Sequence, residues 1–268
     1  MSPKSTPVLA LLRRRITIDG MYESRPLPPI FRWSLPGRFV VFVLAASSIW
    51  CLLSEFYGFC DMRTFTFFIL IPATIALIAI ALVDRARGDG QLWRAVLVGA
   101  IGGFVAACAY DIFRLPWVIG AIDHIGPTWL RLPLFKVFPR FGAMILGMPR
   151  EQFKNFTDSQ FTLSAHVIGW IYHFSNGVTF GVMYMALIGD PRRRTWLWAI
   201  VLAVGLELAM LFTPYTTYFA IRMTALFVTV TLLAHLIFGI ALGLFTKRMY
   251  RSSDNHDRGF PVSGIANC

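Results

Sequence analysis

Thr64–Val83, with the sequence TFTFFILIPATIALIAIALV, is the stretch that decides the fold class. Its 20 residues include no Lys, Arg, Asp or Glu. A helix that rises about 1.5 Å per residue needs about 20 mostly apolar residues to cross the ~30 Å hydrocarbon core of a bilayer. The stretch therefore predicts a transmembrane helix.

Five other stretches satisfy the same condition. Of the 268 residues in the chain, 56% are hydrophobic and 15% are charged, whereas a soluble domain typically has about 25% charged residues. This composition argues against a soluble enzyme and excludes a disordered chain. We therefore expect an all-α, polytopic integral membrane protein with a basic N-terminal segment (1–38), a membrane domain (39–248) and a C-terminal tail (249–268). The six predicted spans are Phe39–Tyr57, Thr64–Val83, Leu92–Phe113, Phe161–Ile188, Thr195–Thr213 and Met223–Thr246.

The net charge of +11 predicts an orientation. Of the 25 Lys and Arg residues, 17 fall in segments on one side of the predicted spans, including three consecutive arginines in the short connection at 192–194. Because Lys and Arg accumulate in cytoplasmic segments, we expect both termini to be cytoplasmic, and we expect the bacterial inner (plasma) membrane as the location. Topology accounts for the basic residues, so membrane lipids and not nucleic acid are the expected partners. The sequence is also compatible with a homo-oligomer.

The connection from Leu115 to Gln160 is long for a loop without structure of its own. Its segment Leu130–Met148 is apolar, and we expect it to form a short interfacial or re-entrant helix, interrupted by Pro133 and Pro139. Three cations lie among aromatic residues there, which fits an element at the level of the lipid headgroups. The segment either only covers the bundle or contacts lipid phosphates through Arg131, Lys136 and Arg140.

One motif occurs twice. His173–Gly181 and His235–Gly243 both read His-x3-Gly-x3-Gly, and Gly103–Ala107 and Gly205–Ala209 form a weaker pair. Small residues four apart lie on one helix face and let two helices approach closely. The motif predicts that the third span packs on the fourth and the fifth on the sixth.

Three ionisable residues fall at the same predicted depth. His173, His235 and Glu207 each lie 12 residues into their spans, near the membrane midplane. A charge at that depth costs about 2.5–3.5 kcal/mol, so it normally faces a partner or a water-filled cavity. We expect Glu207 to bond to a histidine, and such a pair could exchange a proton near neutral pH.

Other polar residues extend this candidate site. His166 and Asn176 lie on the helix face of His173, and we include them in the proton relay or polar site. Asp111 and Arg114 are three residues apart near the end of the third span and can pair. With the adjacent Tyr110, they form a predicted outer gate.

These features support competing functions. The first is proton-coupled handling or transport of a small solute or lipid through the midplane site. The second is a membrane-embedded enzyme acting on a lipid or quinone-like molecule, with His166 or His173 as general base. The chain has no HExxH or GxSxG motif and no paired-carboxylate motif, so the catalytic residues of such an enzyme stay unknown. The third is a non-catalytic membrane assembly subunit.

Cofactor binding is the last question that the sequence addresses. The four cysteines have no spacing typical of a metal site, and we expect no metal and no cofactor. The alternative is a b-type haem, with His173 and His235 as an axial pair at equal depth on two helices.

Overall fold

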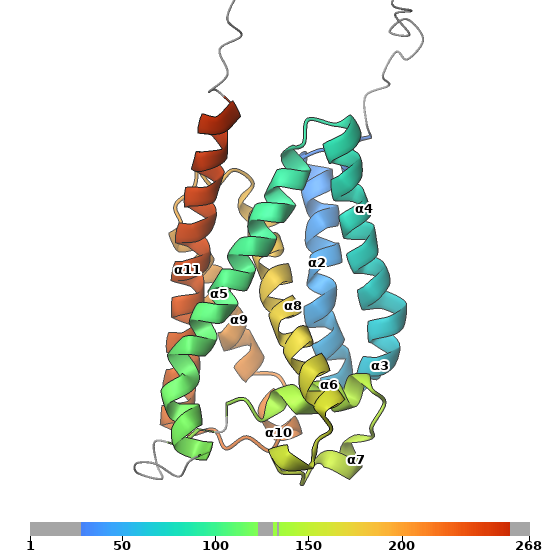
Figure 1. Ribbon diagram of the computed structural model, residues 1–268, viewed down its shortest axis with the longest axis vertical. Helices are drawn as coiled ribbons and strands as arrows, with labels where there is room; N and C mark the ends of the chain where they lie inside the picture. The colour runs from blue at the N-terminus through green and yellow to red at the C-terminus, as the bar shows by residue number, and fades with distance from the viewer. Residues whose placement is uncertain (1–27, 123–130, 133, 258–268) are drawn as a thin grey trace, which may run out of the picture.

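The computed structural model describes residues 28–122, 131–132 and 134–257, and every regular element within them is a helix. The long helices stand side by side as a bundle (Figure 1). They are α2 (Leu35–Phe56), α4 (Ile71–Arg87), α5 (Gln91–Ile122), α8 (Leu163–Ile188), α9 (Leu197–Leu211) and α11 (Ala225–Asp257). The short elements are η2 (Pro29–Phe31), α3 (Met62–Phe65), the π-helical turn η3 (Thr66–Leu70), α6 (Val137–Ile145), α7 (Arg150–Phe153), η5 (Asp158–Gln160) and α10 (Tyr215–Tyr218).

Each of the six predicted spans falls on a helix, and four of these helices are long and apolar enough to cross a membrane. Those four are Leu35–Phe56, Met62–Arg87, Gln91–Ile119 and Ala225–Tyr250. The apolar helix α9 has only 15 residues. α8 has 26 residues, but histidine, serine, asparagine and threonine interrupt its apolar sequence. The described part of the chain is thus helical with four candidate membrane spans, and membrane crossing by α8 and α9 stays a prediction.

Local sequence signals explain where several helices begin and end. The side chain of Asp61 accepts a hydrogen bond from the backbone N–H of Thr64 at 2.8 Å, at the start of the second span. Thr162 caps α8 in the same way, through the N–H of Ala165 at 3.3 Å. These side chains replace partners that the first turn of a helix lacks. α8 ends at Ile188 and is followed by Gly189, whose φ of +75° suits glycine because it has no Cβ.

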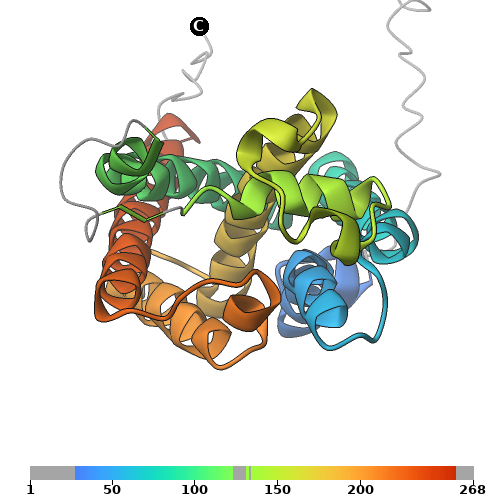
Figure 2. The ribbon, with the colours of Figure 1, turned by 90° about the horizontal axis from the view of Figure 1, so that it is seen from below.

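The helix α8 lies in the middle of the bundle. It packs on α5, α6 and α2, while α11 packs on α5 and α9. Figure 2 shows α8 between α5 and α11 on one side and α2 on the other. The predicted pairing of the third span with the fourth and of the fifth with the sixth is therefore present.

Glycines form the contact between α5 and α8. A Cβ atom on Gly103 would lie 2.1 Å from the carbonyl oxygen of Gly177, and one on Gly181 would lie 2.0 Å from that of Gly99. No side chain fits at these distances, so the two backbones touch. The sequence motif thus acts here as a packing device between helices.

The second pair of helices uses different residues from those expected. A Cβ atom on Gly239 would lie 2.6 Å from the Cα of Ile200, so α11 does approach α9 closely. A Cβ atom on Gly205, however, would have no neighbour within 4 Å, so this glycine lies outside the contact. The small residues on α9 that are fully buried are Ala199 and Ala203. The Gly205–Ala209 likeness was therefore misleading, because it falls on another helix face.

Two prolines lie within helices. α5 continues past the predicted end at Phe113 to Ile122 with Pro116 inside it. Pro139 lies in the first turn of α6, where the missing N–H has no helical partner to lose. The helix α6 is buried along its whole length, and its position at a membrane interface stays a prediction. Pro133 lies outside the described residues, as do 1–27 of the predicted N-terminal segment and 258–268 of the tail.

The two ends of the bundle differ. α6, α7 and α10 gather at one end, called the α6 end below (Figure 1). The opposite end holds the start of α2 and the connections from α4 to α5 and from α8 to α9. Most of the arginines that predicted the orientation lie at this second end, including Arg192, Arg193 and Arg194.

Candidate functional site

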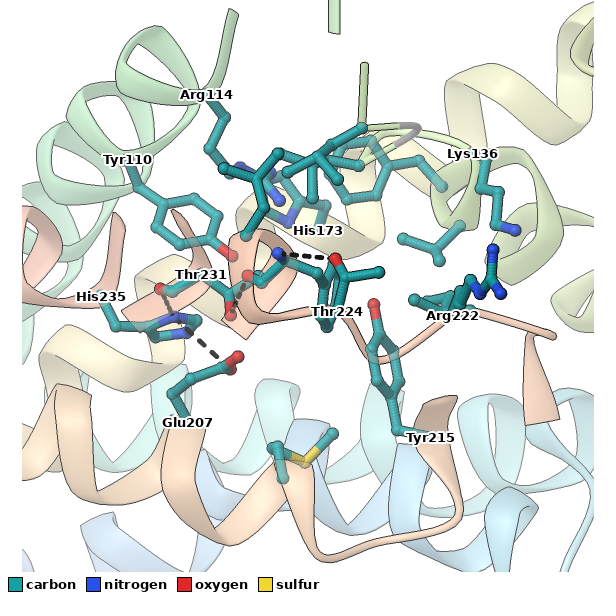
Figure 3. Close-up of a pocket in the computed structure, with 18 of the residues that line it drawn as sticks. Tyr110, Arg114, Lys136, His173, Glu207, Tyr215, Arg222, Thr224, Thr231 and His235 are labelled. Atoms are coloured by element: carbon teal, nitrogen blue, oxygen red, sulfur yellow. Dashed lines mark hydrogen bonds and ion pairs between the residues drawn. The ribbon is translucent and has the colours of Figure 1, made fainter. Parts of the chain in front are cut away.

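A cavity of about 820 Å³ opens at the α6 end, between α5, α6, α8, α9, α10 and α11 (Figure 3). Its volume lies in the range of roughly 300–1,000 Å³ that small-molecule sites occupy. About half of its lining residues are apolar. The polar and aromatic side chains with titratable groups that line it are Tyr110, Arg114, Arg131, Lys136, His173, Glu207, Tyr215, Arg222 and His235.

A second cavity, of about 150 Å³, adjoins the first. It shares Tyr110, His173, Asn176 and His235 with the large cavity and reaches Phe180 and Phe238, further from the α6 end. The two predicted histidines therefore lie where two cavities meet.

His235 and Glu207 form one pair across this junction. Nδ1 of His235 lies 3.5 Å from Oε2 of Glu207 and 2.9 Å from the carbonyl oxygen of Thr231, one helical turn earlier on α11. A backbone carbonyl can only accept, so we infer that Nδ1 carries a proton. In the neutral ring Nε2 is then the nitrogen that can take up a further proton.

His173 belongs to a different pair. Its Nε2 lies 2.8 Å from Oδ2 of Asp111, whose other oxygen accepts a hydrogen bond from Arg114 at 2.5 Å. The contact between Gly103 and Gly177 brings the two side chains together. Asp111 follows Gly103 by two turns on α5, and His173 precedes Gly177 by one turn on the antiparallel α8. Both side chains lean toward the N-terminus of their own helix, so that they meet.

The predicted midplane site and the predicted outer gate thus form one cluster. We expected Glu207 to bond to a histidine, and it pairs with His235, whereas His173 bonds to Asp111 of the expected gate. Tyr110 connects the pairs, because its ring centroid lies 4.9 Å from that of His235 and 6.2 Å from that of His173. Spacing within one helix could not reveal this, since the partners come from different helices.

Burial makes the charge balance of the cluster important. Asp111, Arg114 and Glu207 are each at most 8% exposed. Arg114 compensates the charge of Asp111, but in the described part of the chain the ion pair of Glu207 is with His235. Because an uncompensated buried charge is costly, Glu207 depends on its contact with His235 for compensation.

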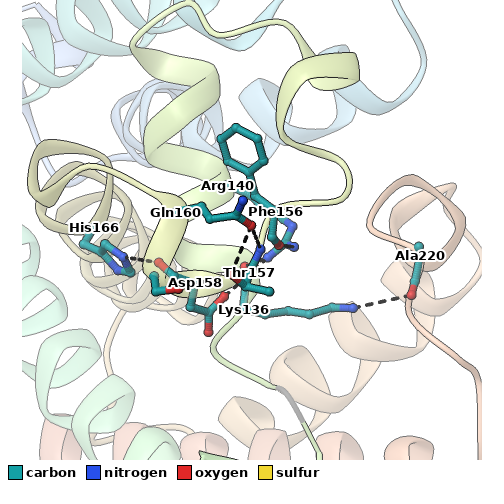
Figure 4. Close-up of polar contacts among 9 residues, drawn as sticks. Lys136, Arg140, Phe156, Thr157, Asp158, Gln160, His166 and Ala220 are labelled. Carbon is teal, nitrogen blue, oxygen red and sulfur yellow. Dashed lines mark hydrogen bonds and ion pairs between the residues drawn. The ribbon is translucent and has the colours of Figure 1, made fainter.

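Two predicted site residues, His166 and Arg140, are not among the residues that line the large cavity. Figure 4 shows their polar contacts. Nε2 of His166 lies 3.0 Å from the carbonyl oxygen of Asp158, and His166 lines a lateral apolar groove beside Trp170. Arg140 donates hydrogen bonds to the carbonyl oxygens of Lys136 and Phe156. Its side chain is 7% exposed, so it fixes the α6 connection and does not present its charge to a headgroup.

The other predicted residues do line the large cavity. These are Asn176, Arg131 and Lys136. Sequence reasoning missed Arg222, Tyr215 and Thr231, which also line it. In the sequence, Arg222 entered only the count of basic residues that predicted the membrane orientation. The one sequence signal that could have placed Thr231 in the site was its position one turn before His235.

The haem alternative stays a prediction. The ring of Tyr110 lies near both imidazoles, and each imidazole has one nitrogen directed at a protein oxygen. Among the described residues no group of three or more His, Cys, Asp or Glu side chains is placed to hold a metal ion.

Comparison with known proteins gives one match. Residues 134–257, which include α6, α8, α9 and α11, match a family of unknown function, DUF6789. No curated protein and no solved structure matches the chain. The matched region contains His173, Glu207 and His235, whereas Asp111 and Arg114 lie outside it.

Proposed function

We propose that the protein moves an anionic solute or lipid together with a proton through the membrane. The observation that carries this proposal is that His173 and His235, each paired with a buried carboxylate, line both of two adjoining cavities. Ionisable groups inside a membrane protein typically mark a substrate or proton pathway. With the arginine-rich end in the cytoplasm, the large cavity would receive its substrate from the outer side.

The charge balance of the Glu207–His235 pair would couple proton binding to anion binding. Glu207 and His235 can bind one proton between them without leaving a buried charge uncompensated. An anion in the same cavity adds a second negative charge, which favours the protonated pair. By thermodynamic reciprocity the protonated pair favours the anion equally. Solute and proton would therefore occupy the site together.

A flux measurement tests this proposal. Full-length protein would be reconstituted into phosphatidylcholine vesicles that contain the pH-sensitive dye pyranine. Sodium salts of glycerol phosphate, hexyl phosphate and succinate would then be added outside. We expect at least one anion to acidify the vesicle interior faster than in protein-free vesicles. Glu207→Gln keeps the size of the side chain but removes the titratable group, so we expect the rate to fall at least tenfold.

His166→Gln is the matched control, because it replaces a histidine of the same helix as His173 that lies outside the large cavity. We expect it to retain the wild-type rate. Proton flux that is unchanged by Glu207→Gln would contradict the proposal.

A further inference from the structure

Cationic side chains gather on one side of the large cavity. Lys136 precedes α6, and Arg222 lies in the connection between α10 and α11. Figure 3 shows their side chains close together, on the side opposite His235 and Glu207. Arg131 lines the same cavity. The segments that supply these charges are far apart in sequence, so the fold itself brings them to one place.

Within the described part of the chain, Lys136 and Arg222 have few acidic groups near them in the cavity. Glu207 is the one carboxylate among the described residues that line the cavity, and it lies with His235 on the opposite side. Nζ of Lys136 lies 3.4 Å from the carbonyl oxygen of Ala220, a long contact. Neither Lys136 nor Arg222 forms an ion pair within the described ranges. Like charges held together in this way attract an anion.

The environment of Lys136 is consistent with an anion site. Burial lowers the pKa of Lys136, the nearby cation of Arg140 lowers it further, and the carboxylate of Asp158 opposes this in part. A bound anion would offset both effects, because it stabilises the charged ammonium. Lysine and arginine are also the side chains that proteins use to bind phosphate.

The wall beside these cations is apolar. Leu132, Leu134 and Phe227 line the cavity and are buried together in one hydrophobic cluster. A free inorganic anion would leave this surface and most of the 820 Å³ volume unused. A ligand with an acidic group and an apolar part would contact both surfaces.

We propose that the cavity binds a phosphate-bearing amphiphile, with its phosphate held by Lys136 and Arg222 and its apolar part against Leu132, Leu134 and Phe227. The inference rests on the proposed function, because it names the substrate class of that site. The ligand would be either a membrane lipid with an anionic phosphate headgroup or a soluble phosphate monoester with a short apolar chain.

Equilibrium binding tests this inference without any proton gradient, so its result is independent of the flux experiment. Hexyl phosphate, inorganic phosphate and hexanol would each be titrated calorimetrically into the full-length protein in dodecyl maltoside. We expect hexyl phosphate to bind at least tenfold more tightly than either of the others. Each CH₂ added from butyl to hexyl phosphate should tighten binding about fourfold, the effect of burying one such group.

Variants separate the charged and apolar parts. Lys136→Gln and Arg222→Gln should each weaken hexyl phosphate binding about tenfold. Phe227→Ala should weaken the binding of hexyl phosphate but leave the binding of inorganic phosphate unchanged. Arg63→Gln is the matched control, because Arg63 lies at the α6 end but lines a different groove, and we expect no effect. Equal binding of hexyl phosphate and hexanol, or unchanged binding in both Lys136→Gln and Arg222→Gln, would overturn the inference.

A second arm distinguishes the two sources. The titration would be repeated in nanodiscs of phosphatidylcholine alone and with one-tenth phosphatidic acid. If phosphatidic acid abolishes hexyl phosphate binding, the site is occupied from the membrane. If hexyl phosphate binds equally in both nanodiscs, a soluble phosphate ester is the ligand. Both results support the site, whereas an absence of hexyl phosphate binding in detergent and in both nanodiscs would overturn it.

Discussion

Oε2 of Glu207 lies 3.5 Å from Nδ1 of His235, and that nitrogen also lies 2.9 Å from the carbonyl oxygen of Thr231. Because both side chains are largely buried, removing one partner leaves the other uncompensated. We expect His235→Leu to lower the free energy of unfolding by about 3–5 kcal/mol. The double variant Glu207→Leu/His235→Leu should be at least as stable as the wild type, since replacing a buried pair by apolar groups is often stabilising.

Thermal unfolding of the purified variants in one detergent would measure this difference. A double variant as unstable as His235→Leu alone would show that the pair does not balance charge in the way we describe. The double variant should also lose anion-driven proton flux, which would separate stability from function.

Asp111 and Asp190 offer a second comparison of charge pairs. Asp111→Asn leaves the guanidinium of Arg114, which is 4% exposed, without its carboxylate. We expect a loss of about 3–5 kcal/mol in the free energy of unfolding. Asp190→Asn removes a pair with Arg192, whose side chain is 42% exposed, and should cost about 1 kcal/mol or less.

The pH dependence of the Asp190 pair has a definite sign. A hydrogen bond from Arg192 lowers the pKa of Asp190. Its small stabilising effect is therefore present above about pH 4, the ordinary value for aspartate, and is lost as the pH falls through the lowered pKa. Unfolding measured between pH 3 and pH 7 in wild type and Asp190→Asn would check this. If Asp190→Asn lowered the free energy of unfolding more than Asp111→Asn, burial would not determine the strength of these two ion pairs.

The contact between α5 and α8 predicts unequal effects of one substitution at two glycines. Gly103→Ala places a Cβ 2.1 Å from the carbonyl oxygen of Gly177, so the helices must separate, and we expect an unfolded or strongly destabilised protein. Gly205→Ala has free space around the new methyl group and should stabilise α9 by up to about 1 kcal/mol, because alanine favours helix. Size-exclusion profiles and thermal unfolding of the two variants would measure this difference. Equal stability of the two variants would exclude a close backbone contact between α5 and α8.

Ala220 occupies a conformation that favours glycine. Its φ is +49°, and it follows α10 in a helix-ending turn where the N–H of Ile221 bonds to the carbonyl of Thr216 at 2.7 Å. Glycine is common at this position because a Cβ costs about 1–2 kcal/mol there. We expect Ala220→Gly to raise the free energy of unfolding by about 1 kcal/mol, measured by thermal unfolding. A loss of stability would show that the turn is not strained.

The helices were predictable because their signals are local. A run such as Thr64–Val83 specifies a helix whatever surrounds it, and Gly177 and Gly181 marked the face on which α8 packs. Helix ends were less predictable. Pro139 was expected to interrupt a helix, but it lies in the first turn of α6, and α5 continues through Pro116 beyond its expected end at Phe113.

The candidate site was predictable as a set of residues but not as a set of contacts. Apolar surroundings identified His173, His235, Glu207 and Asp111 as groups that need partners. Which carboxylate contacts which histidine depends on the axial offset between antiparallel helices. No local sequence pattern specifies that offset. The contacts of Arg140 were not predictable for a related reason, since its partners are the carbonyl groups of Lys136 and Phe156 and the carboxylate of Asp158.

By itself the sequence determined an all-helical chain with apolar helices, its charge asymmetry and the few ionisable residues that such helices must accommodate. Hydrophobicity and helical periodicity depend only on residues that are near one another in the sequence, so they can be recognised without the tertiary structure. Only the tertiary structure decided that His173 bonds to Asp111, that His235 meets Glu207, and that Lys136 and Arg222 face one cavity. These relationships depend on backbone contacts such as Gly103 with Gly177, because such contacts fix the position of each helix against the next.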